Sequence, residues 1–388
     1  MVVFKFGGTS VATPEKIRIQ AEKVKSATGQ YQKIIVVVSA MGKTTDEILL
    51  QAKQIGKIVP SAELDALLNI GEMTTVRLLT FALTNMGVKA IGLNGGEAGI
   101  LTTGNFGNSF ISNINTKIIN NLFNNFDVCV VAGFCGVNKF NQITTLGRGG
   151  SDTTAVALAS AFKCKCFIYT DVDGIFTIDP KLIKNPKINK KININNMLEL
   201  SAFGVKALDT RCVLIASKNH CEINLKNSFS NSDGTAIVSK NFERLKVDGI
   251  GVLKGCAKIK IDLKTKSLAN FLRFCKQNNI QVGGMVVSGY EKTQTVELII
   301  DNEKLQNEGR RLQKTYKNCK IFTNCCCLTL VGGGFASHVE DVFKIINLLK
   351  NNRIKVYALN ITQTVFQFWV NKRKVSFTLK LLKNKFNL

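Results

Sequence analysis

The chain is poor in the residues from which many active sites are built. Its 388 residues include two histidines, one tryptophan and four prolines. His220 and His338 stand apart from any glycine-rich or acidic cluster, which argues against a histidine triad or a histidine-ligated metal. The twelve cysteines form no C-x₂-C pair, because the closest are Cys164 with Cys166 and the run 325–327. We therefore expect reduced, buried thiols and no metal held by the protein's own side chains.

Long hydrophobic runs are also absent. The longest, such as residues 34–40 and 128–133, fall far short of the roughly 18–20 apolar residues that a membrane helix needs. The N-terminus enters an apolar strand pattern without the basic region and apolar stretch of a signal peptide. With 45% hydrophobic and 20% charged residues, the composition predicts a soluble, cytoplasmic globular protein with no membrane partner.

Acidic residues are few relative to basic ones. The chain has 52 Lys and Arg against 27 Asp and Glu, which gives a formal charge of +25. Such a charge suits a nucleic-acid partner. However, the lysines are scattered among Asn, Ile and Phe, as in residues 184–193, and these residue types share codons rich in A and T. No aromatic side chain interleaves that run to stack on bases. We attribute the charge to base bias and predict no nucleic-acid binding.

Short apolar runs alternate with helical patterns over the first 240 or so residues. Strands are expected at residues 2–6, 33–39, 89–93, 128–133 and 166–170, and helices at 14–26, 45–54, 62–86 and 154–162. Continuous apolar strands separated by helices predict an α/β fold, with a mostly parallel sheet sandwiched by helices. Ligands of such sheets bind at the carboxyl ends of the strands.

The pattern changes near residue 245. Two βαββ-like passages follow, with a repeat of about seventy residues, and no proline occurs after Pro186. This period is too long for a solenoid. We predict an α/β domain over residues 1–245, followed by two small α+β modules at residues 250–322 and 323–388.

The most informative segment is residues 144–155. Three glycines surround Arg148, and Ser151 and Asp152 follow where an alanine-rich helix begins. Glycine allows the backbone to approach an anion closely, and a helix start offers unpaired N–H groups. The segment predicts an anion-binding loop with Arg148 as a fork for a carboxylate or phosphate. The alternative is an ordinary strand-to-helix turn capped by Ser151 or Asp152.

Charged and hydroxyl groups follow other strands. Lys5 closes the first strand ahead of Gly7 and Gly8, where its ammonium could lie over phosphates held by backbone amides. A small zwitterion needs an arginine for its carboxylate and an acid for its ammonium, and Arg148 and Glu72 could supply these. Taken singly, a lysine at the end of a strand is usually solvated, and Glu72 could lie on a solvated helix face.

Four blocks together resemble the aspartokinases, within the amino acid kinase superfamily. The blocks span residues 5–11, 38–46, 145–155 and 169–175 and occur in family order. The C-terminal modules are similar to the paired ACT domains of that family, by pattern and not by motif. The resemblance implies an amino acid kinase fold followed by two ferredoxin-like ACT modules. It further implies a homodimer or higher homo-oligomer formed through those modules.

The resemblance also implies a reaction. Mg²⁺ and ATP would phosphorylate the β-carboxylate of L-aspartate to 4-phospho-L-aspartate, the first step toward lysine, threonine and methionine. By match to the family motifs, Lys5 would stabilise the transferring phosphoryl group and Asp152 would organise the site. Aspartate would be held by Ser39, Thr45, Glu72, Phe134, Arg148 and Ser151. The nucleotide would contact Lys5, Phe6, Gly7, Gly8, Thr170, Asp171, Phe176, Lys181, Lys206 and Ala207.

The chain departs from the family pattern at several positions. Lys181 stands where an arginine is usual, and Asp209 and Thr210 replace the usual His-Pro pair before Arg211. Two other hypotheses about the function of the chain therefore stay open. One is another amino acid or carbamate kinase, and the other is a decayed kinase that survives as an amino-acid sensor. The presence of Lys5, Arg148 and Asp152 speaks against the sensor.

Overall fold

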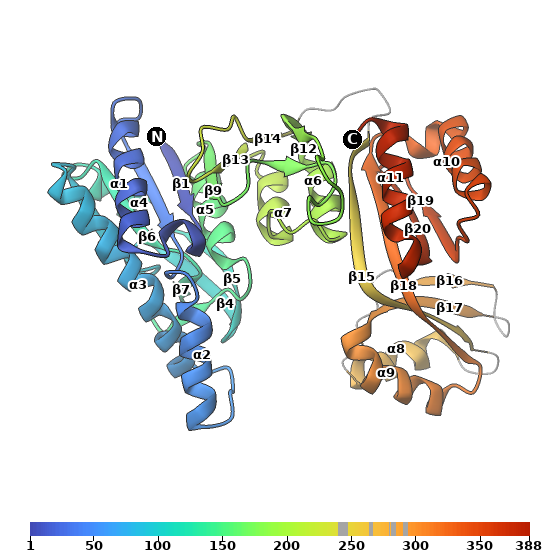
Figure 1. The fold of residues 1–388 in the computed structure, drawn as a ribbon. Helices are drawn as coiled ribbons and strands as arrows, with labels where there is room; N and C mark the ends of the chain where they lie inside the picture. The colour runs from blue at the N-terminus through green and yellow to red at the C-terminus, as the bar shows by residue number, and fades with distance from the viewer. Residues whose placement is uncertain (240–246, 264–266, 279, 281–284, 290–293) are drawn as a thin grey trace. The chain divides into compact units, whose positions relative to one another are not determined.

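The computed structural model describes residues 1–239, 247–263, 267–278, 280, 285–289 and 294–388, which form two compact units (Figure 1). The first unit comprises Met1–Thr177 and Lys187–Phe242, and the second comprises Ile178–Pro186 and Glu243–Leu388. The segment Ile178–Pro186 lies between two parts of the first unit in the sequence but belongs to the second unit. We call this segment the excursion. The predicted boundary at residue 245 lies outside the described residues, and the division at residues 322 and 323 stays a prediction.

An eight-stranded sheet forms the centre of the first unit. Its order is β12-β14-β13-β9-β1-β2-β6-β3, and every described pairing is parallel except that of β13 with β14. The strands are β1 (Val2–Phe6), β2 (Ile34–Val38), β3 (Ala90–Leu93), β6 (Val128–Ala132), β9 (Cys166–Thr170), β12 (Lys191–Asn193), β13 (Ile223–Asn227) and β14 (Thr235–Val238). The predicted strands over the first 170 residues are confirmed, as is the mostly parallel α/β class.

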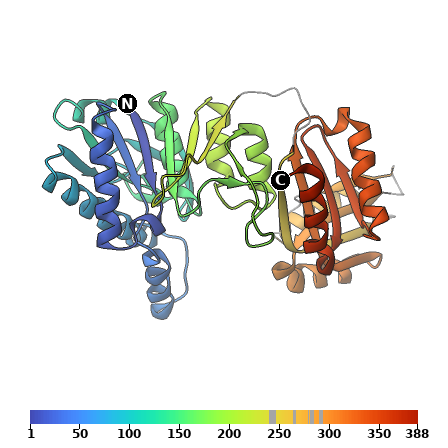
Figure 2. The ribbon, with the colours of Figure 1, turned by 45° about the horizontal axis from the view of Figure 1, so that its top comes forward.

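Helices cover both faces of this sheet (Figure 2). The described helices of the first unit are α1 (Pro14–Thr28), α2 (Thr44–Ile55), α3 (Ala62–Asn85), α4 (Thr116–Leu122), α5 (Gly150–Ala161), α6 (Ile194–Ala202) and α7 (Thr210–Lys218). Alternate residues of β1 and β2 pack with α1 and α3 in one apolar core. Helix α5 contacts the same strands, and its side chains are absent from that core, so it covers the opposite face. Burial on both faces explains why these strands are continuously apolar.

A second, four-stranded sheet of the first unit was not predicted. Its order is β5-β4-β7-β8, with β4 (Ile100–Asn105), β5 (Asn108–Ile114), β7 (Cys135–Val137) and β8 (Ile143–Thr145). These strands carry few apolar residues, so the sequence gives no strong period-two signal for them. The strands β10 (Ile175–Phe176) and β11 (Ile188–Asn189) form a short ribbon at the two ends of the excursion. The sheet matters for function because β8 leads directly into the glycine-rich loop.

The second unit contains one six-stranded sheet with the order β16-β17-β15-β18-β20-β19. Two βαββα passages contribute to it. They are β15 (Val247–Asp262), α8 (Leu268–Gln277), β16 (Val286–Ser288), β17 (Thr295–Asp301) and α9 (Asn302–Thr315), then β18 (Cys319–Gly332), α10 (Val339–Asn351), β19 (Ala358–Ile361), β20 (Val365–Asn371) and α11 (Val375–Phe386). The repeat predicted the βαββ part of each, and the closing helices α9 and α11 were not predicted. The long strands β15 and β18 pair along most of their length and join the two passages. Residues 279 and 281–284, between α8 and β16, lie outside the described residues.

Two observations bear on the composition. The cysteines whose side chains the structure describes are all free, and most are buried. Among the described helices, α3 alone is long and apolar enough to cross a membrane, and 44% of its apolar window is buried. Since α3 supplies Val76, Leu79 and Leu83 to the core of the first unit, its hydropathy is that of a core helix.

Candidate active site

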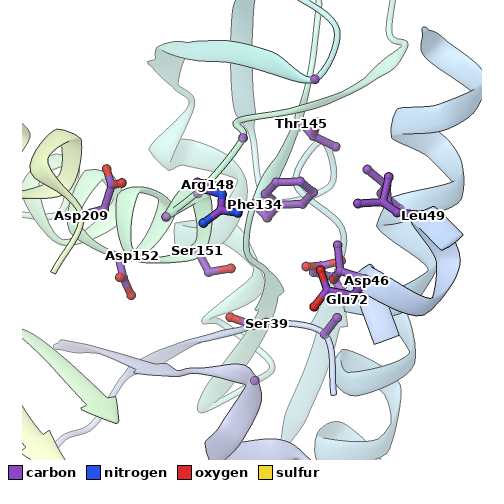
Figure 3. Close-up of a pocket in the computed structure, with 18 of the residues that line it drawn as sticks. Ser39, Asp46, Leu49, Glu72, Phe134, Thr145, Arg148, Ser151, Asp152 and Asp209 are labelled. Atoms are coloured by element: carbon purple, nitrogen blue, oxygen red, sulfur yellow. The ribbon is translucent and has the colours of Figure 1, made fainter. Parts of the chain in front are cut away.

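A pocket of about 960 Å³ lies in the first unit where β1, β2 and β6 end (Figure 3). This volume falls in the range of small-molecule sites. Lys5 reaches it from β1, Ser39 follows β2, and Phe134 follows β6. The carboxyl edge of the sheet was the expected position for a ligand, because parallel strands all end there. Ten predicted site residues line the pocket: Lys5, Gly8, Ser39, Thr45, Glu72, Phe134, Arg148, Ser151, Asp152 and Lys206.

The glycine-rich loop enters the pocket between β8 and α5. Gly147 and Gly149 adopt φ angles of +77° and +69°, a left-handed conformation that favours glycine. Helix α5 begins at Gly150, and Gly149 is its N-cap without a side-chain cap bond. The alternative in which Ser151 or Asp152 caps the helix is therefore wrong, and the helix starts four residues before the predicted Thr154. Both side chains instead lie in the first turn and face the pocket.

A short ion pair joins β1 to α5. Lys5 Nζ lies 2.5 Å from Asp152 Oδ1, and the two side chains are only 11% and 16% exposed. An ion pair this close holds both groups in fixed positions. Gly7 lies next to this ion pair, and a Cβ built on it would lie 3.3 Å from the lysine Nζ. The lysine ammonium is thus fixed at the strand end with the backbone of the following loop next to it.

Acidic groups lie on the opposite side of the pocket. Figure 3 shows Glu72 and Asp46 facing the side that carries Arg148, Ser151 and Asp152. Glu72 is 3% exposed, and burial raises its pKa to about 7, against a hydrogen bond with the Ala40 backbone that lowers it. Its Oε2 atom has no hydrogen-bond partner in the described structure. Such a carboxylate is suited to accept a cationic group from a ligand.

A buried carboxylate that the sequence did not predict supports the loop. Asp65 on α3 is fully buried. Its Oδ2 accepts from the Thr145 backbone N–H at 2.7 Å and from that of Gly107 at 3.0 Å, and its Oδ1 accepts from Thr145 Oγ1 at 2.9 Å. These bonds fix the end of β8 just before the glycine-rich loop. An acidic residue in the first turn of a helix looks like an ordinary dipole partner, so no sequence signal distinguishes it.

Seven predicted nucleotide contacts do not line this pocket. Phe6 is fully buried and stacks on Tyr169 with ring centroids 5.0 Å apart, so its side chain belongs to the core. Thr170 Oγ1 donates to Asp171 Oδ1 at 3.2 Å at the end of β9. The others are Gly7, Phe176, Lys181 and Ala207. Lys181 lies in the excursion Ile178–Pro186, which is part of the second unit.

Asp209 and Arg211, at the start of α7, contact the loop. Asp209 is the N-cap of α7, and its Oδ1 accepts from the Arg211 backbone N–H at 2.9 Å. Aspartate is among the preferred N-cap residues. The Asp209 cap therefore stabilises the start of α7, although Thr210 replaces the usual proline at the first position of the helix.

Comparisons with known proteins agree with this architecture. Residues 1–227 match the family model described as "Amino acid kinase family". An aspartokinase of a Bacillus species is 34% identical over 400 residues, covering 100% of this chain and 97% of the relative. An aspartokinase of Corynebacterium glutamicum is 31% identical over 408 residues, covering 100% of this chain and 96% of the relative.

A solved structure shares the fold of the whole chain. The structure of Escherichia coli aspartokinase III in complex with aspartate and ADP has a TM-score of 0.81 at 19% identity, and covers 99% of both chains. Because the family model matches more than half of its residues, the chain belongs to the amino acid kinase family. Within that family its full-length relatives place it among the aspartokinases.

Proposed function

We propose that the pocket transfers the γ-phosphoryl group of ATP to the β-carboxylate of L-aspartate. One observation carries the proposal: the side of the pocket with Arg148 faces the side with the buried Glu72. An arginine fork suits the substrate's α-carboxylate, and a carboxylate suits its α-ammonium group. The E. coli relative that shares the fold was solved with aspartate and ADP. Ser39, Thr45, Phe134 and Ser151 line the space between these groups.

The reaction needs positioning and charge neutralisation more than covalent assistance. An oxygen of the ionised β-carboxylate attacks the γ-phosphorus, and the bond from that phosphorus to the β–γ bridging oxygen breaks. ADP leaves with the electron pair, and 4-phospho-L-aspartate forms. No proton is removed from the acceptor, because a free aspartate carboxylate is ionised at neutral pH. Lys5 Nζ, held by Asp152, would face the charge that develops on the transferring group.

The nucleotide would lie beside Lys5 and the Gly7–Gly8 backbone, extending toward Thr170 and Asp171 at the end of β9. Lys206 lines the pocket and could contact the phosphates. Contacts from Phe6, Phe176, Lys181 and Ala207 remain proposals, since none of these residues lines the described pocket.

Mg²⁺ is the ion that the proposed chemistry implies. Within the described part of the chain, no three His, Cys, Asp or Glu side chains gather as metal ligands. In phosphoryl-transfer sites Mg²⁺ is usually held by one or two carboxylates together with the nucleotide phosphates. Asp152, a pocket carboxylate, fits an ion that arrives with ATP. When bound, the ion would neutralise phosphate charge, while Asp152 keeps Lys5 in place.

We further propose a homodimer or higher homo-oligomer formed through the second unit. Its two repeated passages support paired ACT modules. Among the described residues, β16 and β19 are the edge strands of the sheet and could pair with another subunit. Buried free thiols fit a reducing cytoplasm. Residues 1–245 would form the catalytic domain, with ACT modules at 250–322 and 323–388.

A coupled assay tests the proposed reaction. The protein is incubated with Mg-ATP and one acceptor at a time: L-aspartate, L-glutamate or carbamate. We expect ADP release with L-aspartate only, and trapping of the acyl phosphate by hydroxylamine as a hydroxamate. Faster turnover of another acceptor would support a different kinase, and aspartate binding without turnover would support the sensor.

A further inference from the structure

Helix α7 holds the glycine-rich loop from outside the pocket. Arg211 Nη2 donates to the carbonyl oxygens of Leu146 and Arg148, the latter at 2.7 Å. Both carbonyls belong to the segment that presents the Arg148 side chain. Arg211 itself is not among the residues that line the pocket. Any influence it has on a substrate must therefore pass through the loop.

These two bonds determine which way the loop peptides face. In a trans peptide, the C=O and N–H groups point in opposite directions. Since the carbonyls of Leu146 and Arg148 face Arg211, the N–H groups of Gly147 and Gly149 face away from it. Both glycines line the pocket, and neither N–H has an acceptor among the described residues. They are therefore oriented to donate to an anion, as Arg148 is.

The loop needs an external constraint because glycine peptides rotate easily. Asp65 fixes its entry at Thr145, and Thr153 N–H bonds back to Gly149 O within α5 at 3.0 Å. Between these points, Arg211 is the side chain that bonds to the loop carbonyls. Without it, the carbonyls of Leu146 and Arg148 would lose this partner, and between the two ends the loop would keep the backbone bonds from Leu146 N–H to Phe134 O at 2.8 Å and from Gly150 N–H to Gly147 O at 3.1 Å.

Asp209 holds Arg211 in turn. Its Oδ1 lies 3.7 Å from Arg211 Nε and accepts from the Arg211 backbone N–H. Its side chain also packs directly against the loop, because a Cβ built on Gly149 would lie 2.3 Å from Asp209 Cβ. Asp209 stands where the aspartokinase pattern has histidine. In this chain, an aspartate supplies both the helix cap and the partner of the arginine.

We propose that Arg211 is a positioning residue, which orients the loop peptides so that Arg148 and the amides of Gly147 and Gly149 face the substrate carboxylate. The inference rests on the proposed function of the pocket. A lysine could not replace the arginine fully, because one ammonium group lacks the planar fork and its geometry. The residue contributes to the aspartate side of the reaction and not to nucleotide binding.

The test compares Arg211→Met and Arg211→Lys with the wild-type protein. We expect Arg211→Met to lower kcat/KM for aspartate by about tenfold or more, the scale of a charged hydrogen bond. The KM for Mg-ATP should change less than about twofold, since the proposed nucleotide contacts of Lys5, the Gly7–Gly8 backbone and the end of β9 lie outside the loop. Arg211→Lys should fall between wild type and Arg211→Met. If Arg211→Met does not fold, as judged by circular dichroism, the same comparison is made with the lysine variant alone.

Amide hydrogen exchange supplies a second readout that needs no substrate. Arg211→Met should exchange faster by about tenfold over residues 145–152. The matched control is Arg77→Met, because Arg77 Nη1 also donates to a backbone carbonyl, that of Gly92, at 2.8 Å, but lies outside the pocket. It should leave both readouts unchanged.

The inference is overturned if Arg211→Met matches Arg77→Met in both readouts, or if the KM for Mg-ATP rises as much as that for aspartate. A wild-type protein without aspartate kinase activity would instead refute the proposed function. In that case the exchange experiment alone decides whether Arg211 orders the loop.

Discussion

Arg148 and Glu72 carry opposite charges on facing sides of the pocket, so the two residues could bind a dicarboxylic amino acid in one orientation. Arg148 lies in the glycine-rich loop and is exposed, whereas Glu72 is buried on α3. Each group would meet the opposite charge on the ligand, so a molecule bound in reverse would bring like charges together. In the proposed reaction, this polarity would determine which carboxylate of aspartate reaches Lys5.

The guanidinium gives the first prediction. Arg148→Ala should lower kcat/KM for aspartate by about 100-fold, because a charged hydrogen bond contributes about 3 kcal/mol. Arg148→Lys should recover only part of this loss, since lysine cannot bind a carboxylate at two points. Steady-state kinetics at saturating Mg-ATP provide the measurement. An Arg148→Ala protein with unchanged aspartate kinetics would mean that another group binds the substrate carboxylate.

Glu72 predicts a pH dependence of substrate binding. Because burial raises its pKa to about 7, the carboxylate takes up a proton as the pH falls below that value. A protonated Glu72 cannot pair with the substrate ammonium, so the KM for aspartate should rise about tenfold per pH unit below about 7. The KM for Mg-ATP, measured from pH 5.5 to 8.5, serves as the control. A flat aspartate profile would remove Glu72 from this role.

Glu72 also predicts that the stability of the ligand-free protein depends on pH, in the direction opposite to that of substrate binding. The folded-state pKa of Glu72 lies above its usual 4.5, so the folded protein binds the proton more tightly than the unfolded chain. The ligand-free protein should therefore lose stability as pH rises from about 4.5 to about 7. At pH 8, Glu72→Gln should raise the free energy of unfolding by up to about 3 kcal/mol. Urea denaturation of both proteins without ligand provides the measurement. A lower free energy of unfolding for Glu72→Gln than for the wild-type protein would contradict this interpretation.

At the scale of elements, the site depends on where helices begin. Helix α5 brings Ser151 and Asp152 to the pocket, and α7 brings Asp209 and the loop contacts of Arg211. Both helices start without proline at the first position. Helix α5 begins at left-handed Gly149, whereas α7 begins at an aspartate cap. The close approach of Asp209 to Gly149 couples the two starts.

This coupling makes Gly149 intolerant of a side chain. Gly149→Ala would put a Cβ within 2.3 Å of Asp209 at a φ of +69°. We expect a loss of at least about 2 kcal/mol in stability from the strained backbone and the clash, measured by thermal denaturation. The control is Gly56→Ala, where φ is −178° and no atom lies within 4 Å of the new Cβ. Equal melting temperatures for the two variants would contradict the coupling.

At the scale of the whole molecule, the chain crosses between units more than once. The excursion Ile178–Pro186 leaves the ribbon of β10 and β11 and joins the core of the second unit. Ile178 pairs with Ile250 of β15 in a parallel bridge, and Lys383 on α11 donates to the carbonyls of Lys184 and Asn185. The second unit therefore includes residues from the middle of the first.

The excursion can be tested through the single tryptophan. Trp369 lies in the second unit and is 6% exposed, so its fluorescence reports unfolding there. Ile178→Ala should lower the stability seen by this probe by about 3 kcal/mol, as for other buried isoleucines. Ile188→Ala, at a residue 36% exposed in β11, should have little effect on the same signal. Equal effects of the two variants would mean that the excursion does not stabilise the second unit.

Local patterns in the sequence determined much of this protein. Apolar runs that must be buried on both faces identify the parallel strands, and glycines around Arg148 identify the loop, because each depends on neighbours in the chain. The repeat beyond residue 245 likewise predicted the βαββ part of the two passages in the second unit.

Only the tertiary structure decided what lies far apart in sequence. Asp65 bonds to Thr145 across 80 positions of the sequence. Arg211 bonds to Arg148 in the loop across 63 positions. Ile178 pairs with Ile250 in the second unit across 72 positions. The polarity of the pocket has the same origin. Burial, and not the residue type, raises the pKa of Glu72. Burial and long-range hydrogen bonds depend on how elements pack, so no local pattern encodes them.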